Sequence, residues 1–586
     1  MIHHAGFSHA VLSFPHVGAC VGTAGFGGTP APDVALDRHA ITAITARGAD
    51  VCYRHDAAGD DESPCHAREL VKAYEECGGI GLVGFSERCA GFVSDLRRRR
   101  CLLFNDAYGS ERIFLHVSGS RVFFSSEAKA ILTVVPATRE FDPLGLAELL
   151  ACGCTLGTRS LFRNIDVLPG GTVLTFENGA VQRRRYFDPA QLEGLEPVSM
   201  PEFVEGFSSS LSTAVNRRLR GSGTVGVSLT GGLDSRMVMA SLDAGPGDVP
   251  CYTFGSMYRT TGDVSVARQV ASACRQPHHV IELGKEFLDN ATEHLENAVY
   301  ASDGYLGLSG AAELYCNRRA RTIAPCRMTG NWGGELMRGV RAFRYALPKG
   351  GFISRDLVDQ VHQSAERFAP PSSNSLSAAL FQQVPHQGYG RYAIERSQVR
   401  VTSPFLDADV VRWLYKAPPA IRESSTTAAA VIARRPELLD IPTDAGLLGV
   451  RPSRLRRMVR RSVVKAEYLT SHGAPDWFAR ISSALPARVL ETRFLGVDKF
   501  QHFRFWIRHD LAGLVRDTLF GQDRDELSTW FDMRRVRQMV AEHVEGRANH
   551  TDAIDKLLTV AVARRTLLGS RPHPSAAEFN QRELAL

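Results

Sequence analysis

The first 195 residues alternate short apolar runs with glycine and polar turns. The clearest runs are residues 102–104, 113–117, 122–124 and 172–176. Short runs that are rich in β-branched and aromatic residues and bounded by turn residues are typical of strands. The pattern therefore predicts one α+β domain over residues 1–195.

The pattern changes after residue 195, where apolar strands alternate with stretches of helical period. Strands are expected at residues 225–229, 251–254 and 279–283, and enough chain for one helix separates each from the next. Strands that alternate with helices in this way form parallel βαβ units. The chain beyond residue 350 is largely helical in pattern. Residues 196–586 are therefore predicted to form an α/β doubly wound domain with a helical C-terminal part.

A chain of 586 residues with 44% hydrophobic and 23% charged residues is long enough for two globular domains. Its net charge of +6 is small against 69 basic and 63 acidic side chains, so charge does not indicate nucleic-acid binding. No N-terminal signal pattern and no apolar run near the roughly 18 residues of a membrane span is present, so we expect a cytoplasmic protein. The twelve cysteines lack zinc-ligand spacing and are expected to be reduced and mostly buried.

Two basic stretches stand out from this balance. Arg97–Arg100 is expected to form a hairpin turn. Seven basic residues and no acidic one lie between Arg451 and Lys465. That stretch is consistent with a solvated helical face or with a surface for an anionic partner, and the sequence leaves both open.

The strongest chemical signal is a loop between the first of the predicted parallel strands and a helix that begins near Asp234. Two adjacent glycines let the backbone approach a ligand, and the helix start offers N–H groups that favour an anion. Thr230 and Ser235 add hydroxyl donors. The predicted phosphate-binding residues are Ser228, Leu229, Thr230, Gly231, Gly232, Asp234 and Ser235.

The carboxylate of Asp234 would repel a phosphate unless a cation lay between them, and Mg²⁺ commonly bridges phosphates and carboxylates. The Gly-Lys-Ser/Thr ending of an ordinary P-loop is missing. The order from Thr230 to Ser235 instead resembles the S-G-G-L-D-S signature of ATP pyrophosphatases, which cleave ATP to AMP and pyrophosphate. The resemblance implies ATP as the ligand, Mg²⁺ held by Asp234, and adenylation of a carboxylate.

Residues 75–450 resemble the class B asparagine synthetase family. Residues 104–110 and 124–132 are similar to its R-D-x-x-G and F-x-S-E-x-K-A-L-L motifs, and residues 161–171 to the motif that follows. Residues 404–407 match its P-F-L-D. The resemblance implies an N-terminal Ntn-hydrolase-like sandwich of the class II glutamine amidotransferase type, followed by an ATP-pyrophosphatase-like synthetase domain.

One departure from the family concerns the nitrogen supply. Glutamine-using members release ammonia with a cysteine directly after the initiator Met, and this chain has Ile2 there. Cys20 could serve only after processing or from a different start. Without a thiolate nucleophile the amidase reaction has no covalent step. The resemblance therefore implies a retained N-terminal domain without glutaminase activity.

A second departure lies in the segment that begins at Thr329, which resembles the family's S-G-E-G-S-D-E-L. Gly334 stands where an Asp usually binds magnesium, while Glu335 remains as an expected metal ligand and catalytic residue. Asn331 stands where asparagine synthetases have Glu and β-lactam-forming relatives have Tyr. We therefore expect Asn331 to handle the attacking amine.

Three further residues are expected beside the nucleotide. Gly330 belongs to the altered second motif. Phe254 and Gly255 end the second predicted strand and would border adenine through backbone groups. A core position for Phe254 is an equally good interpretation.

If glutamine supplies no ammonia, the attacking amine must come from the substrate or from a second substrate. Family members without the N-terminal cysteine include lasso peptide macrolactam synthetases, which join a peptide's N-terminal amine to an Asp or Glu side chain. The long helical C-terminal region, the basic stretch from Arg451 and the form of the second motif favour this interpretation. The resemblance implies a peptide substrate and a leader-processing protease as partner.

Two alternatives stay open. One is an asparagine synthetase-like or β-lactam synthetase-like enzyme that uses ammonia or a small-molecule amine. The other is a non-catalytic scaffold that binds the precursor. Gly334 favours the scaffold, and the intact loop from Thr230 to Ser235 opposes it.

Overall fold

The structure is a computed structural model that describes part of the chain. The described residues are 7–14, 19–26, 33–36, 41–47, 74, 89–95, 98–119, 121–177, 180–220, 223–339, 345–367, 374–422, 425–443, 500–521 and 524–569. Side chains of the first four segments are not described. Ile2 and the basic stretch from Arg451 to Lys465 lie outside these residues, as does the side chain of Cys20.

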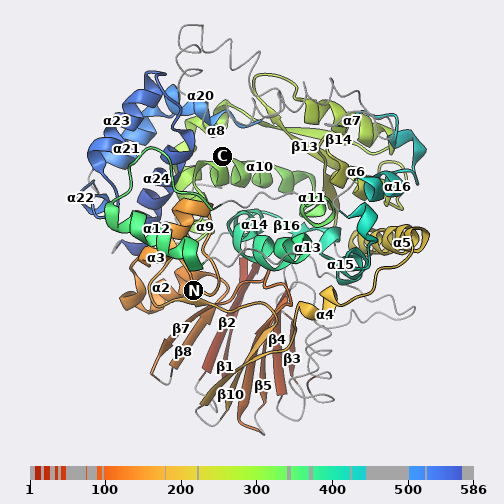
Figure 1. The fold of residues 1–586 in the computed structure, drawn as a ribbon, viewed down its shortest axis with the longest axis horizontal. Coiled ribbons are helices and arrows are strands. Elements are labelled where there is room, and N and C mark those ends of the chain that lie inside the picture. The colour runs from red at the N-terminus through yellow and green to blue at the C-terminus, as the bar shows by residue number, and fades with distance from the viewer. Residues whose placement is uncertain are drawn as a thin grey trace.

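The N-terminal part consists mainly of antiparallel strands, which Figure 1 shows gathered on one side of the molecule. A six-stranded sheet has the order β11-β10-β6-β5-β4-β3, and β8-β7-β9 and β1-β2 form smaller sheets. The strands are β1 (Phe7–Phe14), β2 (Ala19–Phe26), β3 (Asp33–Leu36), β4 (Ile41–Arg47), β5 (Cys89–Asp95), β6 (Arg100–Asn105), β7 (Phe114–Ser118), β8 (Arg121–Ser125), β9 (Asp166–Val167), β10 (Thr172–Glu177) and β11 (Ala180–Arg185). The four strands predicted from the apolar runs are confirmed as β6, β7, β8 and β10.

The helices described with their bounds in the same part of the chain are α2 (Ala128–Val134), α3 (Pro143–Cys152) and α4 (Ala190–Glu193). The predicted arginine turn is confirmed, because Arg98 and Arg99 connect β5 to β6 at the pair Asp95↔Arg100. The boundary predicted between residues 195 and 196 falls in the connection that follows α4 and stays a prediction.

The second part is built on a five-stranded parallel sheet of order β14-β13-β12-β15-β16. Its strands are β12 (Val225–Ser228), β13 (Cys251–Ser256), β14 (His278–Leu283), β15 (Cys326–Thr329) and β16 (Arg400–Thr402). The prediction of parallel strands near residues 225, 251 and 279 is therefore confirmed.

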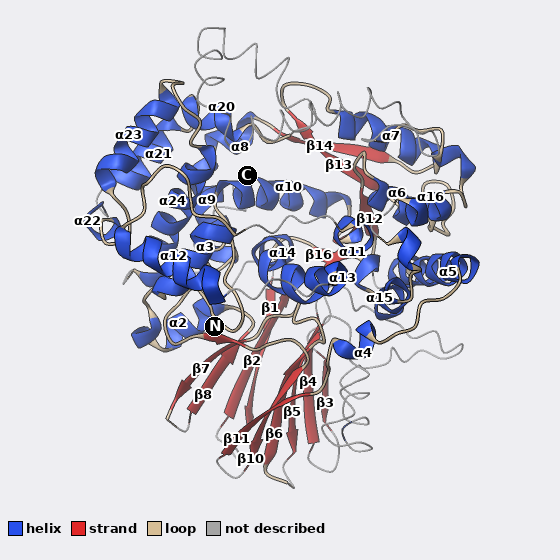
Figure 2. Cartoon of the chain, in the orientation of Figure 1, coloured by secondary structure: helices blue, strands red, loops and turns tan. Residues whose placement is uncertain are grey.

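Helices cover both faces of this parallel sheet (Figure 2). Alternate side chains of the strands point to opposite faces. Val227 and Met328 pack into one core with α6 and α7, whereas Tyr252 and Ile281 pack into another with α10. The helices along this part are α5 (Met200–Leu219), α6 (Leu233–Ala240), α7 (Gly262–Ala273), α8 (Lys285–Asp289), α9 (Ala291–Ala301), α10 (Leu308–Ile323), α11 (Gly333–Arg338), α12 (Arg355–Arg367), α13 (Ser375–Ala378), α14 (Gly388–Arg396), α15 (Ala408–Tyr415) and α16 (Thr426–Ile432).

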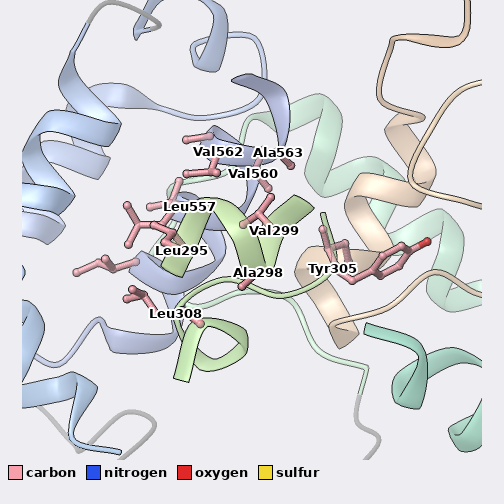
Figure 3. Close-up of a cluster of buried hydrophobic side chains, with 14 of the residues drawn as sticks. Leu295, Ala298, Val299, Tyr305, Leu308, Leu557, Val560, Val562 and Ala563 are labelled. Carbon is pink, nitrogen blue, oxygen red and sulfur yellow. The ribbon is translucent and has the colours of Figure 1, made fainter. Parts of the chain in front are cut away.

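The C-terminal helices pack onto the second of these cores. They are α20 (Phe503–Arg508), α21 (Ala512–Phe520), α22 (Arg524–Leu527), α23 (Met533–Val544) and α24 (Thr551–Ala563). Figure 3 shows Leu295 and Val299 of α9 among Leu557 and Val560 of α24. Each of these side chains is buried. The helical C-terminal part thus extends the core of the α/β part.

The state of the cysteines and the hydropathy of the helices can be compared with the sequence predictions within the described residues. The cysteines whose side chains the structure describes are free thiols, and all of these are buried except the half-buried Cys152. Among the helices described, none is both long and apolar enough to cross a membrane.

A buried carboxylate joins the N-terminal part to the second part. Asp303 accepts hydrogen bonds from the backbone N–H groups of Ala128 and Lys129 at 2.9 and 3.1 Å, and from the Tyr389 hydroxyl at 2.6 Å. Lys129 Nζ lies 3.2 Å from the same carboxylate, and the two side chains are 2% and 0% exposed. Burial lowers the pKa of Lys129, but the charges of Asp303 and of Glu127, whose carboxylate lies 3.1 Å from the ammonium, together outweigh burial and raise that pKa. The lysine is therefore held in its charged form.

We predict that Asp303→Ala lowers the free energy of unfolding by about 3–5 kcal/mol, because it removes the buried carboxylate from a buried ammonium and leaves it only the 40% exposed carboxylate of Glu127. Denaturant unfolding measures this change. The matched control is Glu140→Ala, which breaks the exposed Arg163–Glu140 pair with side chains 50% and 54% exposed. An exposed pair of this kind contributes about 0–1 kcal/mol. Equal destabilisation by the two substitutions would contradict the prediction.

Candidate nucleotide site

Two loops meet at the carboxyl edge of the parallel sheet. Strands β12 and β15 are neighbours in parallel register from Val225↔Cys326 to Ser228↔Thr329. The loop at residues 229–232 leads from β12 into α6, and residues 330–332 lead from β15 into α11. The carboxyl ends of parallel strands are where ligands of such sheets bind. The two loops therefore form the candidate site.

The start of the first loop is anchored to the sheet. The N–H of Leu229, which is buried, donates to the carbonyl of Tyr252 at 2.8 Å. Ser228 Oγ accepts a hydrogen bond from Arg327 Nη2 at 3.2 Å. These contacts fix where the backbone leaves β12, so Ser228 and Leu229 position the loop.

Hydroxyl groups hold the rest of the first loop in shape. The N–H of Thr230 donates to Ser235 Oγ at 3.2 Å, and the two hydroxyl oxygens lie 3.3 Å apart. The N–H of Gly232 donates to Thr230 Oγ1 at 3.3 Å. The N–H of Gly231 donates to Asp263 Oδ1 at 2.7 Å. The loop is thus preformed, and a carboxylate already uses one N–H that was expected to face an anion.

The second loop packs directly against Asp234 in the first turn of α6. A Cβ added to Gly330 would lie 2.5 Å from the N atom of Ser235 and 2.7 Å from the carbonyl carbon of Asp234. A Cβ added to Gly333 would lie 2.8 Å from the carboxyl carbon of Asp234. Real Cβ atoms do not approach other atoms so closely, so both positions require glycine. The structure therefore brings Asp234 and Gly330 together, and their part in nucleotide binding stays a prediction.

Arg338, the last residue of α11, binds the carboxylate of Asp234. Its Nη2 donates to Oδ1 at 3.0 Å and to Oδ2 at 2.8 Å, and the side chains of Arg338 and Asp234 are 27% and 22% exposed. The first turn of α6 and the end of α11 are therefore joined by a charge-assisted contact.

Glu335 lies one turn before Arg338 on α11 and is half-buried. Burial raises its pKa, although a hydrogen bond to its own backbone and the charges of Arg391 and Arg338 lower it. Position 334 contributes no side-chain ligand, and the described part of the chain contains no group of three or more His, Cys, Asp or Glu side chains able to hold a metal. With Asp234 bound to Arg338, these residues do not fit a ready-made divalent-metal site, and Asp234 and Glu335 as metal ligands stay a prediction.

Hydrogen bonds of its backbone hold Asn331 in place in the second loop. Its N–H donates to Thr329 Oγ1 at 3.0 Å, and its carbonyl accepts from Ser403 Oγ at 2.7 Å. The next residue, Trp332, has φ +73°, a left-handed conformation that is uncommon for a bulky residue. Its indole N–H donates to the hydroxyl of Tyr392. The backbone of the loop is thus held on both sides of the Asn331 side chain.

Phe254 and Gly255 lie within β13, which continues to Ser256, so the predicted strand end was short by two residues. The Arg327 guanidinium lies 5.0 Å from the centre of the Phe254 ring, and Phe500 meets that ring edge-on at 5.7 Å between centres. These contacts agree with the core interpretation of Phe254. The predicted role of Phe254 and Gly255 beside adenine stays a prediction.

Sequence reasoning missed two charged residues of the site. One is Asp263, which lies in the first turn of α7 and accepts a hydrogen bond from the first loop. The other is Arg338, which binds Asp234. The available signal for Arg338 was a basic residue one helical turn after Glu335, because residues three apart on a helix are neighbours. Asp263 had no comparable local signal.

Comparisons with known proteins bear on both parts of the chain. Residues 206–398 match the family model described as asparagine synthase, and residues 62–187 match the one described as glutamine amidotransferase domain. These matches support the asparagine synthetase family. The asparagine synthase match contains both loops of the candidate site.

Two relatives show how distant the likeness is. The chain is 24% identical over 294 residues to the glutamine-hydrolyzing asparagine synthetase 2 of Bacillus subtilis, a match that covers 46% of this chain and 38% of the relative. It is 23% identical over 305 residues to amidase chyE of Penicillium rubens, covering 48% of this chain and 44% of the relative. The matched segment therefore spans less than half of each relative.

The close contact between the loops of this asparagine synthase-like part gives a stability prediction. Gly330→Ala should lower the free energy of unfolding by about 1–3 kcal/mol, because the added methyl group has no room against the first turn of α6. The control is Gly513→Ala in α21, where an added Cβ meets nothing within 4 Å. Chemical unfolding of both variants gives the comparison, and a Gly330→Ala variant as stable as the control would contradict the close packing.

Proposed function

We propose that the chain is an ATP-dependent amide-forming ligase that activates a carboxylate by adenylation. The observation that carries this proposal is the interlocking of the loop from Thr230 to Ser235 with the loop at Gly330 on the edge of a parallel sheet. The first loop has the glycines, hydroxyl groups and helix start that suit a pyrophosphate group. The match of residues 206–398 to asparagine synthase supports the same reaction class.

The proposed reaction has two steps. A carboxylate oxygen of the substrate attacks the α-phosphorus of ATP, the bond to the bridging oxygen breaks, and pyrophosphate leaves. An amine then attacks the acyl carbon, a C–N bond forms, AMP leaves with the C–O electron pair, and the amine gives up a proton. Holding amine and acyl-adenylate together replaces a bimolecular encounter with an oriented one, an effect of about 7–11 kcal/mol.

The residues of the site divide between these steps. Thr230, Gly232 and Ser235 would bind the pyrophosphate end of ATP, where the hydroxyl groups and the start of α6 lie. Asp234 would organise the charge at that end. Asn331, fixed by its backbone at the second loop, would face the attacking amine. The family uses ATP typically with Mg²⁺, which would supply positive charge at the phosphates.

For the substrate we infer a peptide precursor that closes into a macrolactam of the lasso type, with a leader-processing protease as partner. Support comes from Asn331 in place of the Glu of asparagine synthetases. A substrate that carries its own amine needs no ammonia. The basic stretch from Arg451 to Lys465 is the proposed precursor surface.

Two other functions follow from specific observations. The similarity to a glutamine-hydrolyzing asparagine synthetase favours an enzyme that uses ammonia or a small-molecule amine, including a β-lactam synthetase-like one. The Arg338–Asp234 pair and Gly334 favour a non-catalytic scaffold, because both reduce the negative charge available for a metal.

Exchange of labelled pyrophosphate into ATP separates these functions. With the full chain we expect exchange that depends on an added linear peptide with a free N-terminal amine and an internal Asp or Glu. Exchange with free aspartate instead of the peptide would favour the small-molecule enzyme. Absence of exchange with every carboxylate tested would contradict adenylation and favour the scaffold.

Replacement of Asp234 tests the assignment of the first loop. Asp234→Ala should reduce the exchange rate by roughly a hundredfold or more, because the charge organisation around the leaving pyrophosphate is lost. The control is Asp510→Ala, which removes an exposed carboxylate that follows α20. Thermal unfolding of both variants checks that they are folded. Exchange that survives Asp234→Ala at the control rate would remove Asp234 from the site.

A further inference from the structure

We propose that Arg338 is a built-in cation of the pyrophosphate site, which neutralises Asp234 and binds phosphate oxygens directly. The inference rests on the proposed nucleotide site and adds to it a residue and a mode of charge neutralisation. It follows from the disagreement between the described residues and the divalent-metal site that the resemblance implies.

The geometry places the guanidinium at the phosphate loop. Both oxygens of Asp234 accept from a single nitrogen of Arg338, at 3.0 and 2.8 Å. Asp234 lies in the first turn of α6, where the N–H groups of the helix start are expected to meet an anion. The second loop approaches the Asp234 carboxyl carbon so closely that Gly333 has no room for a Cβ. Arg338 is therefore held within reach of whatever the loop binds.

The guanidinium keeps donors for a second partner. Arginine has five N–H donors, and only those on Nη2 are used by Asp234. Nε is buried and has no hydrogen-bond partner among the described residues. Arginine presents its donors in a planar fork that suits phosphate as well as carboxylate. One guanidinium can thus bind Asp234 on one side and a phosphate oxygen on the other.

The charges of α11 favour an anion at this site. Gly334 stands where the family's motif has an acidic residue, so this chain has one negative charge fewer in the first turn of α11. Arg338 adds a positive charge one helical turn later, on the same short helix. Asp234 and Arg338 together are neutral, whereas Asp234 alone would repel a phosphate. The site can therefore bind an anion with less help from a metal ion.

Calorimetric titration with inorganic pyrophosphate tests the inference on the full chain. The titration is done once in chelator and once with Mg²⁺ present. We expect wild-type protein to bind pyrophosphate in chelator. Arg338→Gln should weaken that binding by roughly tenfold to a hundredfold, the effect of losing a hydrogen bond to a charged group. Arg338→Lys, which keeps the charge, should recover part of the loss.

Two further variants sharpen the comparison. The double substitution Gly334→Asp with Arg338→Gln restores the acidic residue of the family's motif and removes the guanidinium, and its pyrophosphate binding should require Mg²⁺. Arg163→Gln removes an arginine from an exposed pair far along the chain and should bind as wild type does. Thermal unfolding of each variant identifies any that does not fold.

The outcomes distinguish this inference from the proposed function. Wild-type binding that strictly requires Mg²⁺ and is unchanged by Arg338→Gln would overturn the role of Arg338 and leave the nucleotide site intact. Absence of pyrophosphate binding with and without Mg²⁺ in the folded wild-type chain would overturn the nucleotide site itself, and the role of Arg338 with it. Binding in chelator that Arg338→Gln weakens and Arg338→Lys partly restores supports the inference.

Discussion

The parallel pairing of β12 with β15 is the constraint on which the candidate site depends. The register Ser228↔Thr329 ends both strands at the same level, so the chain must leave the sheet twice at adjacent points. Two loops in so little space can coexist only if one of them lacks side chains at the contact. That explains Gly330 and Gly333, whose Cβ positions are filled by atoms of Asp234 and Ser235. The sheet thus fixes which residues of distant segments can act on one ligand.

Charge within this confined site distinguishes the chain from the family that it resembles. An acidic residue is absent at position 334, and an arginine of the same helix binds the remaining carboxylate of the first loop. The loss of an acid and the presence of a base act in the same direction, toward a site that accepts anions without a crowded set of metal ligands. An enzyme that works on a peptide and a scaffold that only binds one would both keep such a loop. The shape of the loop therefore does not distinguish an enzyme from a scaffold. The distinction depends on whether Asp234 takes part in a reaction.

Much of the fold follows from local patterns, whereas the charged contacts of the site do not. The parallel strands and the loop from Thr230 to Ser235 could be predicted, because alternating periods and adjacent glycines act over a few residues. The Arg338–Asp234 pair joins positions 104 apart, and the Asp263 contact joins positions 32 apart, so both exist only after the sheet has formed. The motif around Lys129 was recognised by resemblance, but its partner Asp303 could not be. An ion pair between distant segments produces no hydrophobic or polar periodicity in either segment from which it could be predicted.

The carboxylate of Asp303 has a consequence for how the molecule unfolds. Backbone groups and an ammonium from the N-terminal part, and a phenol from α14, all end on this one side chain. Separation of the two parts would expose a charge pair that is buried on both sides, so neither part can open at this contact without disturbing the other. We therefore expect the N-terminal part and the second part to unfold cooperatively, whatever reaction either part catalyses. The N-terminal fold thus has a structural role at this contact that does not depend on any chemistry.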